Sequence, residues 1–436
     1  MDASPVRGTS PDAGASAAAA LAPTDAVTSP VPGLSPGLSS GLSPGLSPGL
    51  SPGLSPGLTL LLAAACGLVV ANLYYAQPLA GPISAALGLD ARAAGLIVTL
   101  TQIGYGLGLL FVVPLGDLVE NRRLVLWLVG LCALALAGAA SAATPMQFLA
   151  ATLAVGVCSV AVQVLVPYAA HLSSESQRGR AVGNVMSGLM LGIMLARPVA
   201  SFVAQVSSWP VIFRASAALM LVIAAVLARL LPARTPVAVL RYGPLLASMG
   251  RLFATLPVLR RRALYHACMF GAFSLFWTTT PLLLAGPAFG LSQGGIALFA
   301  LAGVAGAIAA PLAGRVADRG WIRPATAAAM LCAVAAFAMT HLATLGSSAS
   351  LGWLVAAAIL LDFGVAGHMT LGQRALFALD APIRSRLNAV YMTTFFLGGA
   401  LGSALGGWAF ARGGWPLASA IGMGLPLLAA AYFATE

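Results

Sequence analysis

The sequence predicts an all-α membrane protein, with twelve transmembrane helices in two pseudo-symmetric six-helix bundles. Hydrophobic residues make up 59% of the chain and charged residues only 8%, and the mean hydropathy is +0.94, which excludes a water-soluble fold. Twelve apolar stretches of near-bilayer length follow one another from residue 58 onward, and the second six repeat the first six. The repeat is clearest in three residue pairs with a common separation of 206 positions: Arg180 and Arg386, Gly192 and Gly398, and Trp209 and Trp415.

The spans are placed by their apolar length and by the polar, proline or glycine residues between them. A helix needs about 20 residues to cross a hydrocarbon core of about 30 Å. The first six spans are 58–79, 93–113, 124–143, 146–170, 181–205 and 211–231, and the second six are 263–286, 294–311, 324–345, 351–373, 387–411 and 417–433. The sequence therefore predicts an N-terminal bundle over 58–231 and a C-terminal bundle over 263–436, joined by a basic cytoplasmic linker over 232–262.

Residues 1–57 differ from the rest of the chain, because they are rich in alanine, serine, proline and glycine and end in tandem Ser-Pro-Gly-Leu units. A segment of this composition cannot bury a core, so we expect a disordered cytoplasmic tail. It lacks the basic start, short apolar run and cleavage site of a secretory signal. Whether the tail docks a partner stays open at this point.

The net charge of +11 comes from arginine alone and indicates how the chain is oriented. Most arginines of the loops follow the even-numbered spans or lie in the linker, whereas the odd-numbered loops hold only Arg92 and Arg412, with Arg214 near the start of the sixth span. Basic loops are retained on the cytoplasmic side. We therefore expect a multi-pass protein of the bacterial inner membrane with both termini in the cytoplasm. Nucleic-acid binding is not expected, because the arginines do not gather on one amphipathic face.

Two formal charges are expected deep in the membrane, Arg197 in the fifth span and Asp362 in the tenth. A charge at this depth costs roughly 2.5 to 3.5 kcal/mol on insertion scales, so it is rarely kept without a partner or a cavity. Asp362 is either a carboxylate that binds and releases a coupling proton or a structural charge satisfied by hydroxyls or by Arg197. Arg197 does not readily lose its proton, so it either orients a substrate or carboxylate or packs helices through backbone carbonyls.

Several other chemistries find no support in the sequence. The five cysteines lie in apolar spans without Cys-x-x-Cys spacing and are interpreted as packing residues. His266, His341 and His368 are isolated along the chain, and His368 does not share a helix face with Asp362, so we interpret all three as packed residues. No phosphate-binding Gly-x-x-x-x-Gly-Lys loop is present. We expect no metal, no cofactor and no enzymatic activity.

An acidic and basic turn occurs in both loops that follow the second span of each half. In the second copy it reads Gly314-x-x-x-Asp318-Arg319, and in the first it contains Asp117, Arg122 and Arg123. This repeated turn on a twelve-span scaffold resembles the major facilitator superfamily over all residues from 58 onward. The first copy departs from the family pattern, since Asp117 directly follows Gly116 and no arginine comes next. Segments 72–79 and 163–167 and the Arg197-Pro198 pair look like the bacterial sugar-efflux and drug-efflux permease branch.

The resemblance implies roles for these turns in gating. An aspartate is stabilised at a helix N-terminus, so Asp117 is expected to latch the start of the eleventh span near Arg386, and Asp318 the start of the fifth near Arg180. The alternative is that these charges only form turns and set orientation. In the family, spans two with eleven and five with eight slide past each other, and glycines such as 188, 192, 398, 402 and 406 suit such interfaces.

The first, fourth, seventh and tenth spans are expected to line the substrate cavity. Their candidate contact residues are Asn72, Tyr74, Tyr75, Gln77, Gln163, Trp277 and Thr278. The aromatic members could equally belong to the interfacial belt. Few charges, aromatic walls and amide groups suit a neutral or amphipathic solute such as a sugar or a lipophilic drug.

These observations predict a monomeric secondary active transporter that works by alternating access and exports a small organic solute in exchange for protons. Uptake by proton symport is the nearest alternative, and a non-transporting membrane sensor is a further one. The expected partners are the lipid bilayer, a small-molecule substrate and protons. One departure bears on coupling: the arginine that the family often carries four residues before Gly156 is Thr152 here.

Overall fold

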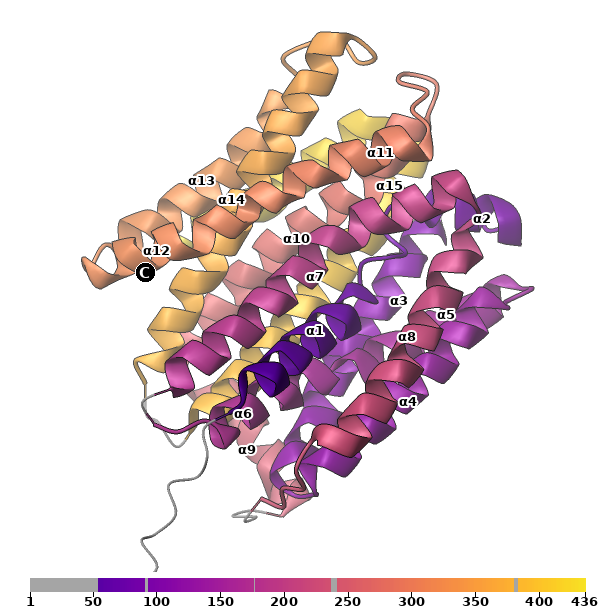
Figure 1. The fold of residues 1–436 in the computed structure, drawn as a ribbon. Coiled ribbons are helices and arrows are strands. Elements are labelled where there is room, and N and C mark those ends of the chain that lie inside the picture. The colour runs from indigo at the N-terminus through magenta and orange to yellow at the C-terminus, as the bar shows by residue number, and fades with distance from the viewer. Residues whose placement is uncertain (1–53, 91–92, 176, 237–240, 380–382) are drawn as a thin grey trace, which may run out of the picture. The chain divides into compact units, whose positions relative to one another are not determined.

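The computed structural model describes residues 54–90, 93–175, 177–236, 241–379 and 383–436, apart from three alanine side chains at 305, 307 and 310. Every regular element in these ranges is a helix (Figure 1). The predicted disordered tail, 1–57, lies almost wholly outside the described residues. Its last two positions, Pro56 and Gly57, belong to the first helix, where Pro56 is suited to an N-terminal helical position.

Six crossings make up the N-terminal half. Their helices are α1 (Pro56–Ala71) with α2 (Ala80–Leu87), α3 (Ala94–Leu107) with η2 (Gly108–Val112) and η3 (Val113–Asp117), α4 (Asn121–Ala140), α5 (Pro145–Ser159) with α6 (Ala161–Leu172), α7 (Arg178–Val206) and α8 (Trp209–Leu230). The first crossing is broken at 72–79, which forms consecutive turns instead of a helix.

The linker and the C-terminal half follow. Their helices are α9 (Tyr242–Thr255), α10 (Pro257–Ala285), α11 (Gln293–Ala300) with η4 (Leu301–Ile308) and α12 (Ala309–Asp318), α13 (Ile322–Met339), α14 (Ser348–Phe377) and α15 (Arg384–Phe433). Although α15 runs on for 50 residues, its backbone is non-helical at Gly413 and Gly414, so it holds two crossings. Nine described helices are long and apolar enough to span a membrane. Adding the interrupted crossings α1–α2 and α11–α12, and counting α15 twice, gives the twelve predicted.

Large apolar side chains cover the outside of the bundle. Trp127 on α4, Leu298 on α11 and Leu401 on α15 are 71%, 71% and 67% exposed, and each lies in an apolar helix. Such a surface is stable only against lipid hydrocarbon. The protein is therefore a multi-pass membrane protein.

The two halves pack their equivalent helices in the same way. In the N-terminal half, a Cβ atom on Gly192 of α7 would lie 2.1 Å from the carbonyl oxygen of Gly67 on α1. In the C-terminal half, a Cβ on Gly402 of α15 would lie 2.0 Å from the carbonyl oxygen of Gly271 on α10. Backbone therefore meets backbone between the first and fifth crossings and between the seventh and eleventh, as small residues allow.

This packing corrects the expected role of the glycines. Gly188 and Gly192 of the fifth span and Gly398 and Gly402 of the eleventh pack inside their own halves, not between the halves. Their spacing is what close helix approach needs, but the sequence cannot say which helix approaches.

The halves do meet through the expected helix pairs, α3 with α15 and α7 with α11. A Cβ on Gly407 would lie 2.7 Å from the backbone nitrogen of Gly95, and the Thr99 and Ser403 hydroxyls are 2.8 Å apart. The backbone N–H of Gly294 donates to Oε1 of Gln205 over 2.9 Å. These contacts hold the halves together at the end of the bundle opposite the basic loops, which we call the opposite end.

Part of the linker, Tyr242–Thr255, forms helix α9, which was not predicted from the sequence. Helix α9 lies at the end that carries the arginine-rich loops, which we call the basic end. The Tyr242 hydroxyl donates to the carbonyl of Phe111 over 2.7 Å, and Nη1 of Arg386 donates to the hydroxyl of Ser248 over 3.0 Å. The linker helix therefore contacts both halves.

Candidate functional site

The break in the first crossing brings polar side chains to the junction of the halves. Residues 72–79 leave the helix between α1 and α2, and in this segment Tyr74 and Gln77 are 6% and 1% exposed. Discontinuous helices are how membrane transporters place irregular backbone around a binding site. The described contacts from this segment lead to α7 and then to the C-terminal half.

Arg197 of α7 lies at the centre of these contacts and is only 3% exposed. Its Nε donates to Oε1 of Gln77 over 2.7 Å. The guanidinium lies over the rings of Tyr74 (4.9 Å), Phe273 (5.1 Å) and Trp277 (4.6 Å, to the ring centre). Cation–π contacts of a desolvated cation are worth about 2 kcal/mol each. These rings, one from the N-terminal half and two from the C-terminal half, therefore stabilise the Arg197 charge where the halves meet.

Asp362 of α14 supplies the opposite charge and is 7% exposed. Its Oδ1 accepts a hydrogen bond from the indole Nε1 of Trp277 over 2.8 Å. Two glycines of η4 pack against Asp362: a Cβ on Gly303 would lie 2.9 Å from Oδ2, and a Cβ on Gly306 would lie 3.2 Å from the Asp362 Cβ. Trp277 thus contacts both buried charges, with its ring face on Arg197 and its N–H on Asp362.

Two polar atoms of this arrangement have no hydrogen-bond partner among the described residues, Nη2 of Arg197 and Nε2 of Gln77. The buried hydroxyls of Ser201 on α7 and of Thr278 and Thr280 on α10 also lack a partner there. Each unmatched buried donor costs about 1–3 kcal/mol. The unmatched donors of Arg197 and Gln77 suit a solute or water that supplies acceptors.

Two of the predicted contact residues, Asn72 and Tyr75, lie inside the N-terminal half. Oδ1 of Asn72 accepts from the hydroxyl of Ser216 over 2.6 Å, and its Nδ2 lies 3.6 Å from the sulfur of Met220. Tyr75 also interacts with Ser216. Both side chains therefore pack between α1 and α8 inside the N-terminal half, away from the central charges, because successive residues of the broken segment point to different sides.

Gln163 faces a separate cavity of about 80 Å³ at the basic end, lined by both halves and the linker helix. Its Nε2 donates to the hydroxyl of Tyr105 over 3.0 Å. Asp117 and Arg386 line the same cavity and interact electrostatically, together with Arg234. The expected partners of the first latch are thus close neighbours across the halves.

The second expected latch has a different partner. Oδ1 of Asp318 accepts from Nη1 of Arg374 over 2.8 Å, within the C-terminal half, and Gly314 packs beside the same guanidinium. Arg180 instead lines a cavity with the start of α1. The prediction that Asp318 meets α7 near Arg180 does not describe this conformation. Helix α7 packs against α11 and η4 of the C-terminal half, and its Arg197 also lies over Phe273 and Trp277 of α10.

The remaining arginines of the two turns stay near the helix ends. Arg122 donates to the carbonyl of Ala228, and Arg123 lies 3.6 Å from the carboxylate of Glu120. Arg319 ends α12 as its C-cap residue. These contacts fix turns at the basic end and do not cross between the halves.

Two buried histidines form a pair, although the sequence indicated that the histidines are isolated. Nδ1 of His266 on α10 and Nδ1 of His368 on α14 lie 2.8 Å apart, and both rings are buried. Nε2 of His341 does bond the hydroxyl of Ser419, over 2.9 Å. The two partners of the pair are 102 residues apart, so only the packing of α10 on α14 reveals it.

Two like halves of six crossings, with opposite charges buried where they meet, define a polytopic membrane transporter. The sequence model of the Major Facilitator Superfamily matches residues 59–353. The chain belongs to this superfamily.

Its relatives agree with this assignment. The chain is 40% identical over 356 residues to the "Uncharacterized transporter YgaY" of Escherichia coli O157:H7, covering 82% of this chain and 89% of that protein. It is 35% identical over 365 residues to the "Probable transporter SCO4007" of Streptomyces coelicolor (strain ATCC BAA-471 / A3(2) / M145), covering 81% and 82%.

Solved structures share the fold. The nucleoside transporter NupG aligns with a TM-score of 0.68 at 16% identity, covering 86% of this chain and 98% of NupG. A D-xylose-proton symporter aligns with a TM-score of 0.64 at 15% identity, covering 86% and 96%. At these identities the likeness shows the fold alone.

Proposed function

We propose that this transporter exports a small organic solute, such as a sugar or a drug-like molecule, in exchange for protons. The observation that carries the proposal is the arrangement of Arg197, Trp277 and Asp362. Charges from opposite halves are buried next to broken crossings, and one indole contacts both. In this arrangement the charge state of Asp362 alters how strongly the two halves attract each other.

Asp362 is the proposed proton site. When ionised, its carboxylate accepts the Trp277 hydrogen bond and is attracted by Arg197. A proton on the carboxylate removes that attraction. A solute that donates a hydroxyl or amine hydrogen to the same carboxylate competes with the proton, and this competition is what exchange requires.

Arg197 and Gln77 are the proposed solute contacts, with Thr278 beside them. The free Nη2 of Arg197 and Nε2 of Gln77 both offer hydrogens, so an acceptor oxygen of the solute satisfies them. The rings of Tyr74, Phe273 and Trp277 then face its apolar body. We propose a neutral or amphipathic solute, because the single guanidinium of Arg197 cannot neutralise several negative charges.

The proposed setting is the inner membrane of a bacterium, with the basic end and both termini in the cytoplasm. Arginine retention at the cytoplasmic side supports this orientation. We propose that a monomer suffices, because each half supplies one of the two buried charges within a single chain. No enzymatic step and no cofactor enters the proposal.

The proposal is tested with purified protein in proteoliposomes under an imposed pH gradient. A panel of ethidium, chloramphenicol, L-arabinose and isopropyl thiogalactoside is screened for flux, and Asp362→Asn is compared with Glu175→Gln, an exposed loop carboxylate. Wild type and Glu175→Gln should show gradient-driven flux. Asp362→Asn should lose it by about 10²-fold while retaining exchange of solute for solute, since only the coupling group is gone.

Direction is read from the proton movement that accompanies the solute. With the basic end facing the bath, proton and solute should move in opposite directions. Movement in the same direction would favour uptake by symport, and a lack of flux for every probe at normal folding would favour a non-transporting sensor. Gradient-driven flux that survives in Asp362→Asn would refute the coupling role.

A further inference from the structure

The pair formed by His266 and His368 has a geometry that simple packing does not require. The two Nδ1 atoms are 2.8 Å apart, the ring centres 5.0 Å and the planes agree within 2°. The centre distance is close to the nitrogen separation plus one ring radius on each side, so the rings meet edge to edge in one plane. This is a direct hydrogen bond between two imidazoles.

The hydrogen bond fixes the proton positions. One Nδ1 donates and the other accepts, so with both rings neutral one carries its proton on Nδ1 and the other on Nε2. The outer Nε2 atoms of both rings are buried and have no partner among the described residues. The pair therefore presents a bare nitrogen at one end and an N–H at the other, at a cost of about 1–3 kcal/mol for each unmatched group.

The groups around the pair disfavour a lasting positive charge. Arg262 lies one turn before His266 on α10 and repels a charge on His368. The rings of Tyr391 and Phe395 on α15 lie over His266, at 5.5 and 4.6 Å. The carboxylate of Glu436 is bound to Arg262. The pair is thus suited to pass a proton rather than to store one.

The pair and the proposed coupling group lie on the same two helices. Asp362 bonds Trp277 and His368 bonds His266, and both contacts join α14 to α10. Along α14, Asp362 and His368 are six residues, or about 9 Å, apart. This exceeds one hydrogen bond, so transfer between them requires intervening water.

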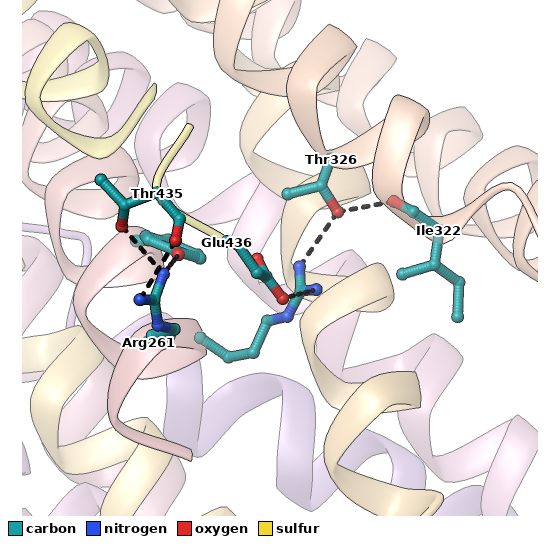
Figure 2. A network of polar contacts seen from close by, with 7 residues as sticks. Arg261, Ile322, Thr326, Thr435 and Glu436 are labelled. Atoms are coloured by element: carbon teal, nitrogen blue, oxygen red, sulfur yellow. Dashed lines mark hydrogen bonds and ion pairs between the residues drawn. The ribbon is translucent and has the colours of Figure 1, made fainter. Parts of the chain in front are cut away.

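The other side of the pair leads to the basic end. Nη2 of Arg262 binds Oε1 of Glu436 over 3.1 Å and its Nη1 bonds the hydroxyl of Thr326 over 3.3 Å. Figure 2 shows Thr435 and Glu436 of the last residues beside Arg261 of α10 and Thr326 of α13. The Glu436 side chain is 31% exposed, so this network closes the bundle only one helical turn from the imidazoles.

We propose that His266 and His368 form a proton relay between Asp362 and the basic end. A proton from the Asp362 side binds the bare Nε2 of one ring, the shared Nδ1 proton moves to the partner, and the partner releases its Nε2 proton toward the basic end. Both rings stay neutral, and their tautomers are exchanged. A turn of both rings by 180° about their Cβ–Cγ bonds then again directs a bare nitrogen toward Asp362 and an N–H toward the basic end, so the pair is reset without returning the proton. This inference rests on the proposed role of Asp362 as the proton site.

The relay is tested without a transported solute. Time-resolved infrared spectroscopy after a pH jump follows the carboxyl C=O signal of Asp362 in purified protein, identified by its loss in Asp362→Asn. The double variant His266→Asn, His368→Asn keeps an amide hydrogen bond at the Nδ1 positions but cannot relay. It should leave the amplitude of the signal unchanged and slow its rise about a hundredfold, a typical loss for a removed proton-transfer group.

Controls separate the two claims. His341→Gln, which changes a histidine outside the pair, should behave as wild type. An unchanged rate in the double variant overturns the relay and leaves the role of Asp362 standing. Absence of an Asp362 signal in the wild type overturns the proposed function itself. Since the chain has only four histidines, ¹⁵N-histidine NMR should also show two coupled rings with opposite tautomers, and equal tautomers would contradict the geometry.

Discussion

The contact between Gly95 of α3 and Gly407 of α15 should decide how readily the opposite end opens. A Cβ on residue 407 would lie 2.7 Å from the nitrogen and 2.8 Å from the Cα of Gly95, whereas ordinary Cβ contacts begin at 3.4 Å. Gly407→Ala therefore forces the two helices apart by roughly 0.6–0.7 Å or strains them. Overpacking of this kind costs about 1–3 kcal/mol.

The cost falls on only one of the conformations that alternating access needs. When the opposite end opens, α3 and α15 separate there and the added methyl group has room. A cost of about 1–3 kcal/mol confined to the closed form shifts the equilibrium toward the open form by roughly 5- to 150-fold. Gly407→Ala should thus populate the open form without a change in the substrate contacts.

Spin-label distance measurements check this shift. Labels on Ser207→Cys and Ala288→Cys, two exposed positions in different halves, report the separation at the opposite end in a background without the native cysteines. Gly407→Ala should move the distance distribution to longer values. Gly424→Ala is the matched control on the same helix, because a Cβ there meets nothing within 4 Å. Identical distributions for all three proteins would refute the reasoning.

Three further outcomes are expected. Gly402→Ala should lower the free energy of unfolding by about 1–3 kcal/mol, since its Cβ would lie 2.0 Å from the backbone of α10. Thermal unfolding can be followed with a thiol-reactive dye that reports the buried cysteines. Equal unfolding midpoints for Gly402→Ala and the control Gly424→Ala would contradict this prediction. Trp277→Phe keeps a ring over the Arg197 guanidinium but removes the hydrogen bond to the Asp362 carboxylate, a loss of about 1.5–3 kcal/mol. Gradient-driven flux should fall by an order of magnitude or more while solute exchange persists. Coupling equal to that of the wild type would exclude a role for the indole N–H. Asp318→Asn should change thermal stability little, because the ion pair of Asp318 with Arg374 is more than half exposed and such pairs are worth about 0–1 kcal/mol. The same variant should nevertheless reduce transport at equal expression. Unchanged flux would mean that Asp318 only forms the turn.

The sequence predicts the crossings well because apolar length is a strong signal in a membrane. It also places Arg197 and Asp362 inside the bundle, since charges there stand out against apolar neighbours. What it does not predict is which side chains meet. Trp277 contacts both charges because α10 passes between α7 and α14, and nothing local to residue 277 shows this.

The remaining differences have the same cause. Helix α9 was hidden in a segment defined by its arginines, although its apolar residues Leu245 and Met249 are buried. Asn72 and Tyr75 were grouped with Gln77 because they are close in sequence. The turns at 72–79 direct Asn72 and Tyr75 toward α8 but Gln77 toward Arg197 of α7. Asp318 pairs with Arg374, which is 56 residues away in the chain, so this contact also comes from helix packing and not from local sequence.

The bend at Gly413 and Gly414 has a practical consequence for the last two crossings. Gly414 has φ of 60° and ψ of −155°, a backbone region that only glycine adopts without strain. The eleventh and twelfth crossings are thus joined almost without a loop and should enter the bilayer as one hairpin. Epitope tags or protease sites inserted here for topology mapping would break that hairpin.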